Sequence, residues 1–289
     1  MPLTSWNGDR VFVDIAVDGC GSGCAYCYIS HPSGTQVIAS PEDVDEAVDG
    51  VLQDARFKPG TLGTTVSVSP STEPFKSPAS TDLISQVLRR VVPLGNPVQI
   101  ATKERVDVRV LTTIANAQVQ NGQVVVFVSV STVRKAAALE PGAAPPLARF
   151  VNFERARTAG VQTCLYVKPF LAQTSRELDD FICVVQQHRP DAVCVGVLYT
   201  SNSTLKQRHP VQTTWTSPGM PESGAAFRAA IAETGIPTFF NSLCVNAFFL
   251  DRRPSLPVWS ELPQLCVGCR SCADDETDIQ FGATASAPR

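Results

Sequence analysis

The sequence predicts an α/β protein, and three observations lead to that fold class. Short apolar runs alternate with segments of helical character along most of the 289 residues. Six expected strands that alternate with helices at this spacing favour a parallel sheet. No Gly-x-Gly-x-x-Gly loop follows the first expected strand, as it would in a dinucleotide-binding sheet. We therefore expect a partial (β/α)6 barrel of the TIM type, with functional groups at the C-terminal ends of its strands.

The expected strands are rich in β-branched residues and are bounded by turn-forming residues. They cover residues 11–17, 64–69, 98–102, 123–130, 161–167 and 192–198. The expected helices lie between these strands and after the last one. They cover residues 41–56, 80–92, 106–116, 146–159, 175–188 and 222–233. Ser40 and Pro41 are a typical N-cap and first residue of the first helix, and Gly160 and Gly235 end two later helices.

Composition and charge narrow the possible classes of function. Apolar residues make up 44% of the chain and charged residues 18%, which is typical of a globular protein. The formal net charge of −3 provides no basic field for duplex nucleic acid. The longest apolar stretches, such as residues 124–130, are far too short to span a membrane, and no secretory signal begins the chain. We expect a soluble, cytoplasmic protein that acts neither on nucleic acid nor at a membrane.

Ten cysteines and only three histidines are the most informative feature of the composition. A reducing cytoplasm does not favour a disulfide framework. Six of the cysteines form two groups near the ends of the chain: Cys20, Cys24 and Cys27, and Cys266, Cys269 and Cys272. Soft thiolate ligands with almost no histidine nearby favour iron–sulfur sites over zinc.

The first cysteine group lies on a short glycine-containing loop directly after an expected strand. Three thiolates can hold one cubane cluster and leave its fourth iron without a protein ligand. An open iron can bind a substrate-like ligand, by the logic that separates catalytic from structural metal sites. Two alternatives remain at this point: a zinc site completed by His31, or three cysteines of the core.

The spacing Cys-x-x-x-Cys-x-x-Cys, with Tyr26 before the last cysteine, resembles the signature of the radical S-adenosylmethionine superfamily. Over residues 11–170 the chain looks most similar to the branch that contains spore photoproduct lyase. Four segments in the correct order carry this resemblance: residues 19–28, 69–75, 100–103 and 139–149.

The resemblance implies a specific chemistry. S-adenosylmethionine would bind the open iron of a 4Fe-4S cluster held by Cys20, Cys24 and Cys27. One electron would then cleave it to methionine and a 5′-deoxyadenosyl radical, which abstracts hydrogen from the substrate. Tyr26 belongs to the implied cofactor-binding set. Three groups complete that set: Ser71, Thr72 and Glu73 near the methionine amine; Lys103, Ser129, Ser131 and Arg149 near its carboxylate and the ribose; and Gly196 near the adenine.

One departure from that branch concerns the substrate. Spore photoproduct lyase uses a cysteine close to the segment after the second strand as a hydrogen donor. This chain has no cysteine between Cys27 and Cys164. Together with the weakly acidic charge, that difference argues against repair of thymine dimers.

The second cysteine group has the spacing Cys-x-x-Cys-x-x-Cys, with Cys244 upstream. It predicts an auxiliary 4Fe-4S cluster, with a four-cysteine zinc site as the alternative. If Cys244 is a ligand, the cluster is closed and can only pass electrons. If Cys244 is a buried structural thiol, as its apolar neighbours allow, a second open iron could bind substrate. Cys164, Cys183 and Cys194 are expected to be small core residues.

These observations predict two domains, a radical S-adenosylmethionine barrel over residues 1–236 and an auxiliary-cluster module over residues 237–289. The expected activity is hydrogen abstraction from a small-molecule substrate of the natural-product or nucleoside type. An electron donor such as flavodoxin or ferredoxin would supply the reducing electron. Two alternatives are a nucleic-acid lyase or modifying enzyme of the spore photoproduct lyase type, and a non-catalytic iron–sulfur electron carrier.

Overall fold

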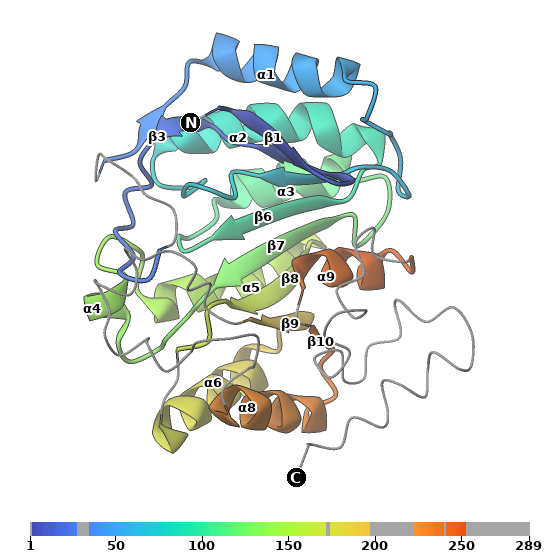
Figure 1. Cartoon of the computed structure of the whole chain (residues 1–289). Helices are drawn as coiled ribbons and strands as arrows, with labels where there is room; N and C mark the ends of the chain where they lie inside the picture. Colours follow the sequence, from blue (N-terminus) through green and yellow to red (C-terminus); the bar gives the residue numbers. More distant parts are fainter. Residues whose placement is uncertain (1, 28–34, 172–173, 197–221, 240, 253–289) are drawn as a thin grey trace.

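The computed structural model describes residues 2–27, 35–171, 174–196, 222–239 and 241–252. Its main strands are β1 (Thr4–Asn7), β2 (Arg10–Val13), β5 (Thr65–Val68), β6 (Val98–Thr102), β7 (Val124–Ser129), β8 (Gln162–Val167), β9 (Ala192–Val195) and β10 (Thr238–Phe239). They form one eight-stranded sheet in the order β1-β2-β5-β6-β7-β8-β9-β10 (Figure 1). β1 pairs antiparallel with β2, and every later pair in that order is parallel. The expected mostly parallel α/β architecture is confirmed.

The strands differ from the sequence prediction in two ways. The expected strand over residues 11–17 is two strands, because β2 ends before Asp14 and β3 (Ala16–Asp18) turns away to pair with β4 (Val37–Ile38). In addition, β1, β4 and β10 are strands that the sequence prediction does not contain. β4 and β10 have only two residues each, too few to show a strand period in the sequence.

The six expected helices are present, and two further helices, over residues 136–139 and 242–249, are not predicted from the sequence. The helices are α1 (Pro41–Gln53), α2 (Pro78–Val91), α3 (Val108–Ala117), α4 (Ala136–Leu139), α5 (Pro146–Ala159), α6 (Ser175–His188), α8 (Glu222–Glu233) and α9 (Ser242–Phe249), with a short 3-10 turn η1 (Val92–Leu94). Ser40 caps α1 in a capping box with Asp43. Ser77 caps α2 in the same way with Ser80, so this helix begins earlier than expected. In the described residues, no helix is both long and apolar enough to cross a membrane.

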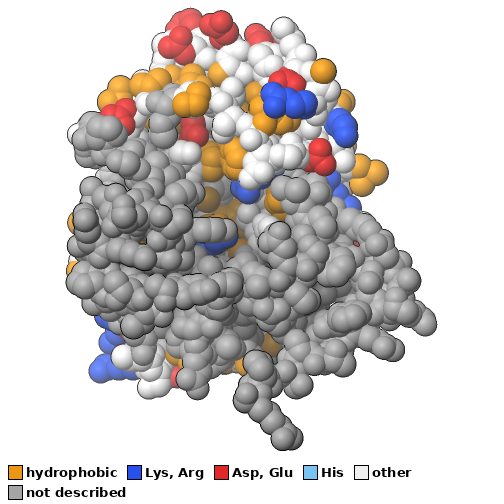
Figure 2. All heavy atoms as spheres, viewed as in Figure 1, with side chains coloured by type: hydrophobic (Ala, Val, Ile, Leu, Met, Phe, Trp, Pro, Cys, Tyr) orange, Lys and Arg blue, Asp and Glu red, His pale blue; other side chains and the backbone are white. Residues whose placement is uncertain are grey.

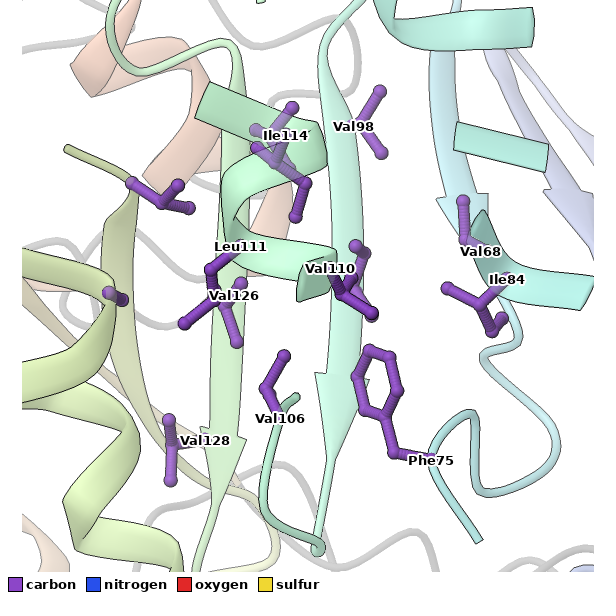
Figure 3. Close-up of a cluster of buried hydrophobic side chains, with 14 of the residues drawn as sticks. Val68, Phe75, Ile84, Val98, Val106, Val110, Leu111, Ile114, Val126 and Val128 are labelled. Carbon is purple, nitrogen blue, oxygen red and sulfur yellow. The ribbon is translucent and has the colours of Figure 1, made fainter. Parts of the chain in front are cut away.

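The sheet separates two hydrophobic layers. Strand residues alternate between its faces, and in β7 Val124, Val126 and Val128 belong to the large core under the helices. Their neighbours Val125 and Phe127 belong to a smaller cluster on the opposite face of the sheet, which we call the inner face. In Figure 3, valines of the strands meet apolar side chains of α2 and α3. The labelled members are Val68, Phe75, Ile84, Val98, Val106, Val110, Leu111, Ile114, Val126 and Val128.

Helix α9 covers the inner face near the N-terminal ends of the strands (Figure 1). The side-chain amide of Gln99 donates to the Asn246 side-chain oxygen at 2.7 Å and to the Ser242 carbonyl at 2.9 Å. The Asn246 amide donates to the Val98 carbonyl at 3.2 Å. Arg252 then donates to backbone carbonyls just before β5. The described beginning of the predicted C-terminal module, residues 237–239 and 241–252, therefore packs with the sheet, and the boundary at residue 236 stays a prediction.

Replacing Asn246 by alanine should destabilise the fold by about 1–3 kcal/mol, because Asn246 is fully buried and its loss leaves polar partners without hydrogen bonds. Urea unfolding of Asn246→Ala against wild type would measure the change. Thr112→Ala is a suitable control, since exposed Thr112 bonds only to its own helix, and it should stay within about 0.5 kcal/mol. Equal effects of the two substitutions would contradict the docking role of α9.

Candidate active site

The first cysteine loop begins where the short strand β3 ends. Gly19 opens the loop with a φ of +69°, and a Cβ on it would overlap the carbonyl oxygen of Thr35. Only glycine fits that conformation and that close approach. The three thiols of Cys20, Cys24 and Cys27 are each partly buried and form no disulfide.

Burial is the largest influence on two of these thiols. It raises the pKa of Cys20 above its ordinary value and raises the pKa of Cys24 to about 11. The Ser22 hydroxyl faces the Cys20 sulfur and lowers the pKa of that thiol in part. Cys24 also packs beside Tyr26, Leu139 and Leu171 in a small apolar cluster. The thiolates of Cys20 and Cys24 are therefore disfavoured unless a positive group stabilises them.

The three thiols do not surround one point. In the described residues, no three histidine, cysteine, aspartate or glutamate side chains are placed to hold a single metal ion. A cubane cluster does not require such convergence, because its thiolates bind different iron atoms. His31, the predicted fourth ligand of the zinc alternative, lies outside the described residues.

The turn after β5 contains Ser71, Thr72 and Glu73. It begins at Ser69, which has a φ of +51° and whose hydroxyl lies 2.7 Å from the Thr72 hydroxyl. The Ser71 N–H donates to the Asp14 carboxylate at 3.3 Å. Asp14 is 5% exposed, and burial raises its pKa to about 6 although hydrogen bonds from Ser71 and Thr72 lower it in part. The buried Asp14, which directly follows β2, thus supports the turn after β5.

Glu73 joins that turn to the end of β6. Its carboxylate accepts hydrogen bonds from the Thr102 hydroxyl, from the Lys103 N–H at 2.8 Å and from the Phe75 N–H at 3.3 Å. The Glu73 side chain is buried, and burial raises its pKa above the ordinary value. Its carbonyl oxygen also accepts from the Gln36 side chain at 2.8 Å. Glu73 therefore orders the backbone around the predicted methionine-amine position.

Lys103 connects the cysteine loop to the end of β7. Its ammonium donates to the Ser129 hydroxyl at 2.8 Å and lies 5.8 Å from the centre of the Tyr26 ring. The same ammonium lowers the pKa of Cys24 in part, so it acts on the thiol electrostatically. The structure thus brings Lys103, Ser129, Tyr26 and Cys24 together, although they come from three separate segments.

Arg149 has a different place from the other predicted cofactor residues. Its side chain is fully buried and forms an ion pair with Glu140 at 2.7 Å. It also donates to the carbonyls of Ala144 at 2.6 Å and Ser129 at 2.9 Å. This guanidinium therefore binds protein groups and stabilises the residues around the site. Direct contact between Arg149 and a cofactor stays a prediction.

Ser131 and Gly196 lie at the same edge of the sheet. Ser131 is buried, and its hydroxyl faces the Tyr26 phenol, whose pKa it lowers in part against the dominant effect of burial. Gly196 follows β9, and its carbonyl accepts from the Phe170 N–H at 2.9 Å. A Cβ on Gly196 would overlap the Lys168 side chain. A larger residue at 196 would therefore displace that lysine.

The remaining cysteines separate into three situations. Cys244 lies on α9, is 4% exposed, and packs in the inner-face cluster with Cys164 and Cys194. This position favours a buried structural thiol, and ligation by Cys244 stays a prediction. Cys183 is exposed on α6, so the expectation that it is a core residue is wrong. The remaining predicted ligands lie outside the described residues: Cys266, Cys269 and Cys272.

Comparison with known proteins finds solved structures that share this fold. No family model and no curated protein matches the sequence. Among solved structures, Streptococcus suis SuiB bound to its precursor peptide SuiA superposes with a TM-score of 0.57 at 9% identity over 84% of this chain. Spore photoproduct lyase complexed with dinucleoside spore photoproduct gives a TM-score of 0.54 at 14% identity over 79% of this chain. The chain has the radical S-adenosylmethionine fold.

The radical S-adenosylmethionine fold is shared over different fractions of these neighbours. The match covers 51% of the SuiB chain and 75% of the spore photoproduct lyase chain. A second SuiB structure, bound to S-adenosylmethionine, matches 85% of this chain with a TM-score of 0.53. The chain therefore spans about half the length of SuiB.

Three residues near the first cysteine loop are not predicted from the sequence. They are Asp14, Glu140 and Gly142. Asp14 carries a signal, since a lone carboxylate interrupts an apolar strand. Glu140 and Gly142 lie in the segment that resembles the family, but their contacts with the cysteine loop span more than a hundred residues and leave no local pattern.

Asp14→Asn should increase stability at pH 7.5 by roughly 3 kcal/mol at most, since the folded pKa of about 6 lies well above the ordinary aspartate pKa of 3.8. The folded protein binds this proton more tightly than the unfolded chain. Wild type therefore loses stability as pH rises from about 4 to about 6. Denaturant unfolding of both proteins from pH 4 to 8 would measure this, and a gain independent of pH would contradict it.

Proposed function

We propose that this chain is a radical S-adenosylmethionine enzyme that abstracts hydrogen from a small-molecule substrate. The observation that carries the proposal is the cysteine loop at the C-terminal edge of the sheet. There, Cys24 lies beside Tyr26 and within electrostatic reach of Lys103. The shared fold supports the same conclusion, because its solved neighbours include an S-adenosylmethionine complex.

The loop fits a 4Fe-4S cluster on its own chemistry. The Ser22 hydroxyl is buried without a hydrogen-bond partner and lies close enough to the Cys20 thiol to lower its pKa in part. This placement suits a permanent thiolate, which accepts hydrogen bonds from such groups. Burial disfavours the thiolates of Cys20 and Cys24 in the protein alone, so a cationic cluster would supply the missing stabilisation and release protons on binding. Cys20, Cys24 and Cys27 would hold that cluster.

Residues beside the loop fit S-adenosylmethionine. When bound, the cluster would supply one electron that cleaves the sulfonium to methionine and a 5′-deoxyadenosyl radical. Lys103 and Ser129 present an ammonium and a hydroxyl suited to a carboxylate and a ribose. Glu73 and Asp14 hold the turn that contains Ser71 and would orient the methionine amine. The apolar cluster around Tyr26 would exclude water from the radical.

The arrangement of the inner face of the sheet supports the proposal of a modest-sized substrate. Helix α9 fills the inner face near the strand N-termini, which leaves the C-terminal half beside the cysteine loop. Phe127 and Tyr166 line that face, and their rings pack edge to face with 5.5 Å between the ring centres. In Figure 2, hydrophobic and basic side chains are visible near the middle of the view. We infer a natural-product or nucleoside substrate that carries both apolar and polar groups.

The finer features of the proposal concern electron transfer and location. Cys266, Cys269 and Cys272 would hold an auxiliary 4Fe-4S cluster that passes an electron or binds substrate. A flavodoxin or ferredoxin would reduce the first cluster in the cytoplasm. The absence of a cysteine between Cys27 and Cys164 separates this proposal from repair of DNA photoproducts.

Anaerobic reconstitution followed by dithionite and S-adenosylmethionine should yield 5′-deoxyadenosine. Cys24→Ala should reduce the yield below detection, because it removes a cluster ligand. Cys183→Ala is the matched control, since Cys183 is exposed on α6, and it should retain the wild-type yield. Chromatography of the products would measure both.

Iron analysis tests the two clusters separately, since two cubanes require about eight irons per chain. About four irons together with zinc would contradict the auxiliary cluster but not the radical chemistry. Fully loaded wild-type protein that forms no 5′-deoxyadenosine would contradict the enzyme proposal.

A further inference from the structure

Residues 139–142 bind the cysteine loop through its backbone. The Ala25 N–H donates to the Leu139 carbonyl at 2.8 Å, and the Gly142 N–H donates to the Ser22 carbonyl at 3.0 Å. These two backbone hydrogen bonds lie on either side of Cys24. The four residues therefore hold the loop where its ligands are spaced, and we call them the loop clamp.

Gly142 allows the loop clamp to approach closely. A Cβ at this position would overlap the carbonyl oxygen of Gly21. The Lys76 ammonium donates to the Gly142 carbonyl and forms an ion pair with Glu104 at 3.0 Å. The clamp is thus fastened both to the loop and to the segment that follows β6.

Glu140 is the charged member of the loop clamp. It is 2% exposed, and its carboxylate accepts a hydrogen bond from the Tyr26 hydroxyl. The other carboxylate oxygen faces Arg149 at 2.7 Å, and neither side chain of that pair is exposed to solvent. Arg149 in turn donates to the Ser129 carbonyl at 2.9 Å. A buried ion pair therefore runs from the cysteine loop to the end of β7.

Two opposite charges lie beside the cysteine loop. The Lys103 ammonium is 5.8 Å from the centre of the Tyr26 ring, and the Glu140 carboxylate accepts a hydrogen bond from the Tyr26 hydroxyl. Glu140 is the member of the ion pair that contacts the cysteine loop, because it accepts a hydrogen bond from Tyr26, two residues from Cys24. Arg149 contacts Glu140 on its other carboxylate oxygen. Because the groups are buried, water screens these charges weakly.

We propose that Glu140 is a positioning residue that holds the cluster loop through Tyr26 and, balanced by Arg149, lowers the reduction potential of the bound 4Fe-4S cluster. This inference rests on the proposed function. Reduction adds one negative charge to the cluster, so a nearby carboxylate disfavours the reduced state and a nearby ammonium favours it. Hydrogen bonds and charges close to the sulfurs are among the factors that set cluster potentials.

The test is a redox titration of the reconstituted full chain without S-adenosylmethionine, followed by electron paramagnetic resonance of the reduced cluster. Glu140→Gln keeps the size and an acceptor for Tyr26 but removes the negative charge. Its midpoint potential should shift to a more positive value than that of wild type. Lys103→Met removes the opposing charge, and its potential should shift in the negative direction.

The double variant Glu140→Gln with Arg149→Met separates charge from packing. It removes both members of the ion pair, so its potential should return from that of Glu140→Gln towards the wild-type value. A purely structural role would instead give the double variant the larger disturbance. Unchanged potentials in both Glu140→Gln and Lys103→Met, at full iron content, would overturn the inference.

Iron content and the ultraviolet–visible spectrum accompany each titration. Should Glu140→Gln fail to fold, the double variant compared with Arg149→Met alone still tests the sign, because these two proteins differ only in the charge of residue 140. Wild type that binds no cluster would overturn the proposed function itself. Wild type that binds cluster and forms 5′-deoxyadenosine, with potentials insensitive to these charges, would overturn only the role of Glu140.

Discussion

The buried ion pair between Glu140 and Arg149 is the interaction on which the candidate site depends. Taking two charges out of water is costly, and an incomplete set of partners would leave the pair unfavourable. Here the Tyr26 hydroxyl and two backbone carbonyls provide further partners for the pair. The pair joins the cysteine loop, the end of β7 and the start of α5. The loop is consequently placed by the barrel and not by its own sequence alone.

The parallel sheet gathers the rest of the site. Residues that follow β5, β6, β7 and β9 meet at one edge because parallel strands end on the same side. Glu73 links the turn after β5 to Lys103, and Lys103 reaches Ser129. The opposite end of the inner face is closed by α9. The polar residues and thiols therefore lie at the C-terminal ends of the strands, and the N-terminal ends are covered by the packing of α9.

Local signals explain which elements could be predicted from the sequence. The helix over 146–159 has the expected bounds because Pro146 and Gly160 mark its two ends. The strand over 11–17 was expected to be continuous because its apolar pattern continues past Asp14, whose burial depends on Ser71. Among the site residues, the cysteines have a spacing that can be recognised. Glu140 does not, because its partner Tyr26 is 114 residues away.

Helix α9 has a consequence for how the protein is made. Asn246 bonds to Gln99 across 147 residues of chain, a contact that closes a very long loop. During synthesis, the strands and the cysteine loop leave the ribosome well before their partner on the inner face. Until residue 252 has emerged, the Gln99 amide and the apolar side chains near Phe127 face water. The inner face can therefore close only after the first cysteine loop and the strands of the sheet have been synthesised.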